Sequence, residues 1–245
     1  MSGTEPEERV RRPMLLQRWR DVAFVHWRFD PDRVADLIPN DLAVDTYDGA
    51  AWVTLTPFVV EASRPPVVPP IPGLSNFLES NVRTYVVGPD GRDGLWFLTL
   101  ETNSLSTIVA ARMAIGIPYR WATMTRHRAG NRVTYCSRRR LANAAPHHHT
   151  TVSTNREGAI ADARLTAWLT GRWRAWSRVA GRLVVVPVEH ESWPISDATL
   201  VDHNDTLLTS LGLPEPTGEP LVHTAPGVRA RLGWPTAVTE QRRES

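Results

Sequence analysis

Three polar residues interrupt one apolar segment at every second position, and their types suit proton transfer and anion binding. In the segment FLESNVRTYVV these residues are Glu79, Asn81 and Arg83. Alternate residues of a strand point to one face, so the three share a face with Phe77 and Tyr85. A glutamate can act as a general acid or base, and an arginine can bind a carboxylate or a carbonyl.

This polar face has three interpretations in the sequence alone. It can be the solvent side of a surface strand, which the alternation by itself favours. It can line a polar cavity, because the opposite face is not strongly apolar and includes Ser80 and Thr84. In the third interpretation, Glu79 and Arg83 form a structural ion pair on one strand face.

The sequence VEHESW places a histidine between two glutamates. On a strand, Glu189 and Glu191 point together and His190 points away from them. We expect His190 to be buried and hydrogen-bonded, and Trp193 to be a packing residue. The run His147-His148-His149 is expected to be a surface loop without a metal, because adjacent histidines point in different directions.

The sequence contains no lysine, so all 28 basic residues are arginine. A lysine imine is therefore excluded. Cys136 is the only cysteine, which excludes an internal disulfide and a multi-cysteine metal site. No phosphate-binding glycine loop, Gly-x-Ser-x-Gly elbow or His-Glu-x-x-His zinc motif occurs, and we expect no cofactor.

Charge and hydropathy argue against a nucleic acid or a membrane as the partner. The net charge is +2, and only Arg138–Arg140 form a tight basic run, which is typical of a solvated strand end. No apolar run approaches the roughly 18 to 20 residues that cross a bilayer. The start of the chain has no signal-peptide pattern, so a cytoplasmic location is expected. The sequence leaves a homo-oligomer open.

Turn and cap signals divide the chain into many hairpins and a few helices. We predict one domain over 13–235, with disordered tails at 1–12 and 236–245. The predicted hairpins and helices indicate a mostly antiparallel α+β fold. Hairpins are predicted within 42–60, 77–102, 121–139 and 172–190, a proline-rich loop over 63–73, and helices over 30–39, 104–115, 161–171 and 196–212.

Several segments resemble, in the same order, those of the YqjF-like proteins, an uncharacterised bacterial family in the acetoacetate decarboxylase-like superfamily. They include QRWRDVAFVHWRFDPDRVADLIPNDLAVDTYDGAAWVTLTPF, FLESNVRTYV, ARMAIGIPY, LTGRWRAW and VEHESWPI. The resemblance covers about 15–234. It implies curved antiparallel sheets that form a barrel-like core around an internal pocket, with flanking helices. The polar face of 77–87 would then face the pocket.

The same resemblance implies the pocket for this chain but not the decarboxylase reaction. ARMAIGIPYRW matches the decarboxylase signature at Arg112, Gly116 and Pro118, but Tyr119 and Arg120 occupy its two lysine positions. Acetoacetate decarboxylation in that superfamily proceeds through a lysine imine, which this chain cannot form. The pocket is implied without that chemistry.

Two further positions resemble decarboxylase residues. Glu79 resembles a pocket glutamate, and Arg28 in HWRFDP matches an arginine in a shorter stretch.

We therefore predict a small-molecule-binding protein with an internal polar pocket. The candidate catalytic residues are Glu79 and Tyr119. The candidate ligand-binding residues, for an anionic or carbonyl-bearing compound, are His26, Arg28, Asn81, Arg83, Tyr85 and Arg120. One alternative is a lyase, isomerase or hydrolase that uses Glu79 and Tyr119 without an imine. The other is an interaction protein that uses the ten tryptophans.

Overall fold

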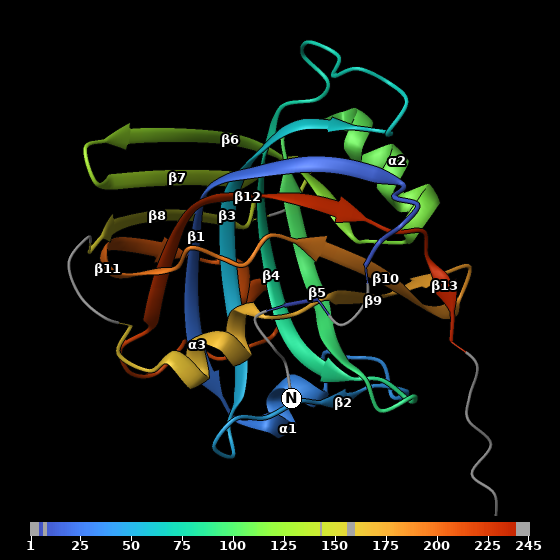
Figure 1. Cartoon of the computed structure of the whole chain (residues 1–245). Helices are drawn as coiled ribbons and strands as arrows, with labels where there is room; N and C mark the ends of the chain where they lie inside the picture. The colour runs from blue at the N-terminus through green and yellow to red at the C-terminus, as the bar shows by residue number, and fades with distance from the viewer. Residues whose placement is uncertain (1–4, 7–8, 143, 156–159, 239–245) are drawn as a thin grey trace, which may run out of the picture.

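The computed structural model describes residues 5–6, 9–142, 144–155 and 160–238, and long curved strands dominate it (Figure 1). The strands are β1 (Leu15–Phe29), β2 (Ala43–Val44), β3 (Ala51–Arg64), β4 (Phe77–Val87), β5 (Asp93–Thr102), β6 (Tyr119–Ala129), β7 (Arg132–Arg139), β8 (His147–Thr154), β9 (Arg174–Val179), β10 (Arg182–His190), β11 (Ser196–Asp205), β12 (Leu221–Leu232) and β13 (Thr236–Ala237). The helices are α1 (Pro31–Ala35), α2 (Leu105–Ile115), α3 (Ala163–Thr170) and α4 (Leu207–Ser210).

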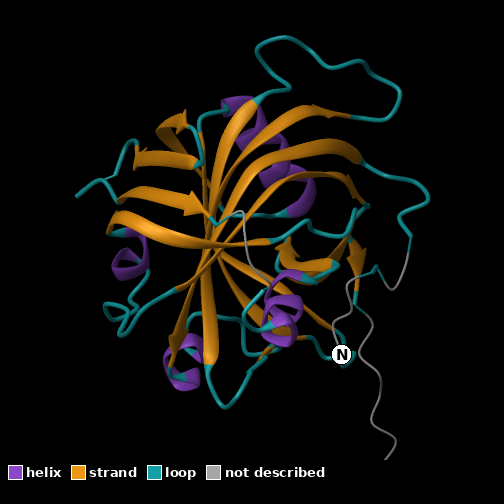
Figure 2. Cartoon of the chain, turned by 60° about the vertical axis from the view of Figure 1, so that its left-hand side comes forward, coloured by secondary structure: helices purple, strands orange, loops and turns teal. Residues whose placement is uncertain are grey.

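The strands close into two rings that share β12, β1, β3, β4 and β5. The long ring continues from β5 through β6, β7, β8 and β11 back to β12. The short ring continues from β5 through β9 and β10 back to β12. The ladders are antiparallel except β5–β6 and β5–β9. The predicted α+β class with curved, mostly antiparallel sheets is confirmed, and Figure 2 shows the helices around the outside.

Because β4 lies in the wall that the two rings share, one of its faces points into the long ring and the other into the short ring. Val82 packs in one apolar core with Val133 and Val152, which come from β7 and β8 of the long ring. Ser80 on the same face accepts or donates a hydrogen bond at 2.9 Å to Nε2 of His148 in β8. The polar face of β4 is therefore turned toward the interior of the short ring.

Side-chain caps fix the helix starts. Asp30 Oδ1 accepts from the Asp32 N–H before α1, and Asp162 caps α3 in the same way. Ser104, rather than the neighbouring Asn103, caps α2. Asn103 is used elsewhere, since its Oδ1 accepts from the Leu78 N–H at 2.9 Å.

Gly116 ends α2 with a left-handed φ of 65° and sets the approach of β6 to the barrel. A Cβ at this position would lie 1.9 Å from the backbone carbonyl oxygen of Arg178 in β9. Only glycine fits both the conformation and the close approach. This contact places Tyr119, three residues later, at the start of β6.

Three predicted elements are corrected by the structure. Residues 196–212 do not form one helix: β11 pairs with β8 and β12, and only the short α4 follows. The histidine run 147–149 opens β8 and is not a loop, with His148 buried and its neighbours half-buried. Within 42–60, β2 pairs with β4 instead of β3, and the turn has a single bridge from Tyr47 to Ala50.

Parts of the two predicted tails are held against the barrel. Val10 is buried; its N–H donates to Glu189 and its carbonyl oxygen accepts from Arg231. Thr236 and Ala237 form β13 beside β10. Residues 1–4, 7–8 and 239–245 lie outside the described residues, and the single-domain boundary at 13–235 stays a prediction.

Among the described residues, no helix combines the length and the apolar character needed to cross a membrane.

Substitution of Gly116 tests the close approach at the end of α2. We expect Gly116→Ala to lower the free energy of unfolding by about 3 kcal/mol or more, because the methyl group would meet a carbonyl oxygen in addition to the left-handed strain. Gly130→Ala is the matched control. Gly130 also has a positive φ but no atom within 4 Å of an added Cβ, so about 1 kcal/mol is expected. Equal losses in urea unfolding would contradict this reading.

Candidate functional site

A cavity of about 830 Å³ lies inside the short ring and opens to solvent. Its walls come from β1, β3, β4, β5, β9 and β10, with Tyr119 of β6 and Leu232 of β12, and α2 and the loop over 65–75 complete them at one end. That loop arches over the end of the molecule at which α2 lies (Figure 1). The barrel thus encloses a space large enough for a small molecule.

The polar face of β4 forms a strip on the wall of this cavity. Glu79, Asn81 and Arg83 all line it, and their exposed fractions are only 6%, 3% and 9%. Their side chains are therefore held away from bulk water. Of the interpretations left open by the sequence, the geometry matches the cavity and not a solvent-facing strand.

Glu79 and Tyr119 form a buried hydrogen-bonded pair on the cavity wall. The Tyr119 hydroxyl donates to Glu79 Oε2 at 2.6 Å. Burial raises the pKa of Glu79 to about 7, against the opposing effects of the Tyr119 and Asn81 hydrogen bonds and the Arg83 charge. Burial and the neighbouring Glu79 raise the pKa of Tyr119 well above its usual value. Glu79 is thus placed to exchange a proton near neutral pH.

Arg83 has no carboxylate within ion-pairing distance in the described part of the chain, so the Glu79–Arg83 ion pair considered above is not formed. Its Nε is buried without a hydrogen-bond partner, and its guanidinium lies 5.3 Å from the centre of the Phe24 ring. Burial lowers the pKa of Arg83, against the favourable effects of Tyr85. The guanidinium is thus buried beside the cavity with a free Nε and no carboxylate in an ion pair with it among the described residues.

Two further polar atoms beside this strip have no partner. Asn81 donates to Glu79 Oε1 at 3.4 Å, while its own Oδ1 has no hydrogen bond. The Thr56 hydroxyl on β3, opposite Asn81 in the register, is also unpaired. Buried polar atoms usually have partners, so these two atoms have hydrogen-bonding capacity left over beside the cavity.

Arg172 and Arg174 reach the cavity from the segment that leads into β9 and from β9 itself. Arg172 Nη1 donates to Asp45 at 2.7 Å and to Asp93 at 2.8 Å, and Arg174 pairs with Asp93 at 3.1 Å. These two arginines have carboxylate partners, in contrast to Arg83.

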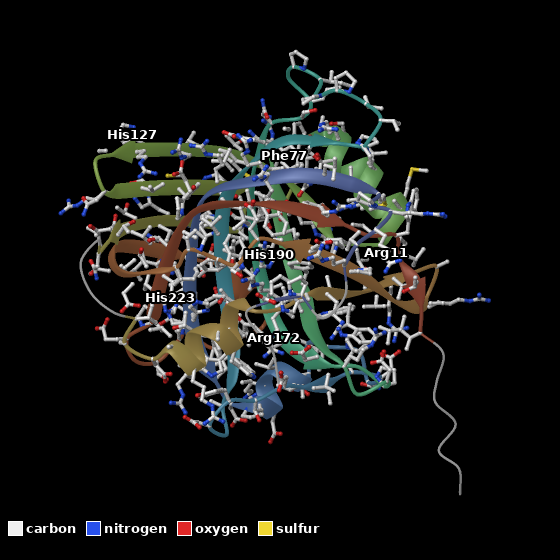
Figure 3. All side chains as sticks on the ribbon, in the orientation of Figure 1. Arg11, Phe77, His127, Arg172, His190 and His223 are labelled. Carbon is white, nitrogen blue, oxygen red and sulfur yellow. The ribbon has the colours of Figure 1, made fainter. Side chains whose placement is uncertain are left out.

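His190, at the end of β10, lines the cavity among aromatic rings. Its ring centre lies 4.3 Å from that of Trp173 and 4.8 Å from that of Trp193. Its Nδ1 donates to the Glu191 carbonyl oxygen at 2.7 Å, and burial lowers its pKa to about 4. His190 is therefore neutral at physiological pH. Figure 3 shows His190 and Arg172 in the middle of the molecule.

Four candidate site residues lie away from the cavity. Arg28 and Arg120 are exposed on the outside of the barrel. The Arg28 guanidinium lies 5.7 Å from the centre of the Trp52 ring, and the charge of Arg120 opposes the rise that burial causes in the pKa of Glu101. His26 and Tyr85 are buried and do not line the cavity, although they lie on the same strand faces as Phe24 and Arg83, and Tyr85 interacts favourably with the Arg83 guanidinium. His26 Nδ1 and the Tyr85 hydroxyl each lie 2.8 Å from Thr54 Oγ1, and Tyr85 donates to the Leu169 carbonyl oxygen.

Arg172 and Arg174, around the start of β9, are not among the site residues expected from the sequence, which predicts His190 as a buried, hydrogen-bonded residue and Trp193 as a packing residue. The signal for the arginines was present, because Arg172 and Arg174 are two residues apart in LTGRWRAW and reach one side. His190 is buried and hydrogen-bonded, as expected. No cluster of three or more potential metal ligands occurs in the described residues.

Comparison with known proteins identifies the family. The model of the DUF2071 family, described as an uncharacterized conserved protein, matches residues 16–229. The chain belongs to the DUF2071 family. A relative of the chain is the uncharacterized protein YqjF of Bacillus subtilis strain 168, which is 30% identical over 212 residues, covering 86% of this chain and 87% of YqjF.

Solved structures place the DUF2071 chain in the acetoacetate decarboxylase-like fold. An acetoacetate decarboxylase-like enzyme from Sphingomonas wittichii RW1 superposes with a TM-score of 0.66 at 16% identity, over 94% of each chain. The enduracididine biosynthesis enzyme MppR, complexed with pyruvate, superposes with a TM-score of 0.66 at 15% identity, over 96% of this chain and 94% of that one. At these identities the likeness shows the fold.

The raised pKa of Glu79 predicts a pH-dependent stability. The folded state holds this proton more tightly than the unfolded state, so its contribution is present below pH 4.5 and is lost as the pH rises to about 7. Glu79→Gln does not titrate. As the pH rises from 4.5 to 8, the wild type should therefore lose up to about 3 kcal/mol of its free energy of unfolding relative to Glu79→Gln, measured by urea unfolding. The exposed Glu219→Gln is the control, and a pH-independent difference for Glu79→Gln would contradict the burial argument.

Proposed function

We propose that the protein binds a small anionic or carbonyl-bearing molecule in this cavity, with Arg83 as the main recognition group. The observation that carries the proposal is the buried Arg83 guanidinium, whose Nε has no partner and which no carboxylate neutralises among the described residues. A carboxylate or carbonyl oxygen of a ligand would supply the missing hydrogen bond. The unpaired Asn81 and Thr56 atoms would bind polar groups of the same ligand.

A second candidate function is a proton-transfer enzyme, and the Glu79–Tyr119 pair favours it. The pKa of Glu79 is about 7, the range in which a carboxyl group can both accept and donate a proton at physiological pH. Tyr119 can donate a hydrogen bond to a carbonyl oxygen when Glu79 is engaged. The sequence has no lysine, so this activity would be a lyase, isomerase or hydrolase reaction without an imine.

Replacing the unpaired cation tests the binding role. In Arg83→Met we expect a ligand that co-purifies with the wild type in native mass spectrometry to be lost, and the affinity for added pyruvate or acetoacetate to fall at least tenfold. The empty variant should unfold at an equal or higher urea concentration, because a buried unpaired charge is removed. Arg120→Met, on the outside of the barrel, is the matched control and should keep the ligand.

Binding that is unchanged in Arg83→Met would contradict the proposal. A wild-type protein that carries no ligand and binds neither acid would favour the interaction-protein alternative.

Exchange of carbon-bound protons tests the enzyme candidate. In D₂O, we expect the wild type to accelerate deuterium incorporation at the methyl group of pyruvate, followed by proton NMR. Glu79→Gln should slow this exchange at least tenfold without loss of fold, the size expected when a general base is removed. Glu219→Gln should exchange like the wild type. Exchange at the uncatalysed rate with the wild type would leave a binding protein as the function.

A further inference from the structure

The cavity is much more apolar than its polar strip suggests. α2 contributes Ala110, Ala111 and Ala114 to the wall, and β10 contributes Val186 and Val188. The charged side chains, by contrast, are gathered along β4 and around the start of β9, and the polar side chains elsewhere in the lining are uncharged, such as Gln17, Ser63, Ser75, Ser106 and Thr107. The cavity therefore has a polar region and a long apolar wall.

The apolar lining continues out to the mouth. Ile71 and Leu74 in the loop over 65–75, and Trp234 after β12, all line the cavity. Their exposed fractions are 47%, 51% and 61%, so large apolar side chains remain in contact with water there. Contact of this apolar surface with water is unfavourable, and the apolar part of a ligand would remove it from water.

The size of the cavity also exceeds the needs of a very small acid. Ligand cavities of about 300 to 1,000 Å³ typically enclose drug-sized molecules, and this one is about 830 Å³. A three- or four-carbon acid bound at Arg83 would leave most of the apolar wall facing water.

We propose that the ligand is an amphipathic carboxylic acid, with its carboxylate on Arg83 and an alkyl or aryl body along α2 and the cavity mouth. The proposal rests on the anion-binding function proposed above and adds the substrate class. Glu79 and Tyr119 would then lie beside the first carbons of the chain rather than at its far end.

The alanines of α2 provide the room for this body. Ala110 and Ala114 are one helical turn apart on one face and remain accessible while lining the cavity. A larger side chain at either position would project into the space assigned to the ligand. Val109 is on the same helix, is 59% exposed and does not line the cavity, so it offers a control with the same added ring.

A chain-length series measured by isothermal titration calorimetry tests the proposal. With the wild type we expect octanoate to bind at least 30-fold more tightly than butanoate, since each buried methylene contributes about fourfold, or about 0.8 kcal/mol. Ala110→Phe and Ala114→Phe should weaken octanoate binding at least tenfold and change butanoate binding less than threefold. Val109→Phe should bind both acids like the wild type. The comparison of butanoate with octanoate uses the wild type alone, so it remains informative even if the phenylalanine variants do not fold.

The outcomes separate this proposal from the one on which it rests. Equal affinities for butanoate and octanoate, or unchanged octanoate binding in both alanine variants, would overturn the amphipathic ligand and leave anion binding intact. If 1-octanol bound as tightly as octanoate and Arg83→Met bound octanoate normally, the anion-binding role would fail and the apolar site would stand. No binding of any acid would overturn both.

Discussion

The closure of two rings around one shared wall is the constraint on which the rest of the molecule depends. β4 is in that wall, so neither of its faces can reach bulk water. One face is satisfied by apolar packing against β7 and β8. The other carries a glutamate, an amide and a guanidinium into a cavity, where desolvating them is costly unless they find partners. Glu79 accepts a hydrogen bond from Tyr119, but Arg83 forms no ion pair with a carboxylate in the described residues.

Other buried charged side chains of the barrel form ion pairs, and Arg83 differs from them in this respect. Arg172 and Arg174 share the carboxylates of Asp45 and Asp93, and Glu101 pairs with Arg139 at 2.6 Å. Arg83, on the cavity wall, has no such ion pair in the described residues, and its Nε has no hydrogen-bond partner. Natural proteins carry such locally unfavourable features mainly at functional sites. The raised pKa of Glu79 follows from the same burial.

Local signals in the sequence predicted local structure well, and failed where pairing partners are distant in the chain. The hairpins within 77–102, 121–139 and 172–190 and the start of the helix near residue 30 follow from neighbouring residues. Residues 196–205 form a strand because β8 and β12 flank them, and no local pattern reports those neighbours. Within the candidate site, Tyr119 and Arg120 are adjacent in one strand and had to face opposite sides, so one of the two was bound to lie outside. Tyr85 shares the face of Arg83 but lies beyond the cavity, whose extent depends on side chains from eight strands.

The central claim is that Arg83 receives the anionic end of a ligand inside the short ring. A crystal structure of the protein soaked with octanoate tests it most directly. We expect the carboxylate within hydrogen-bonding distance of Arg83 Nε and the alkyl chain running toward α2. Density for octanoate only on the outside of the barrel, or a carboxylate inside it that leaves Arg83 Nε unpaired, would contradict it.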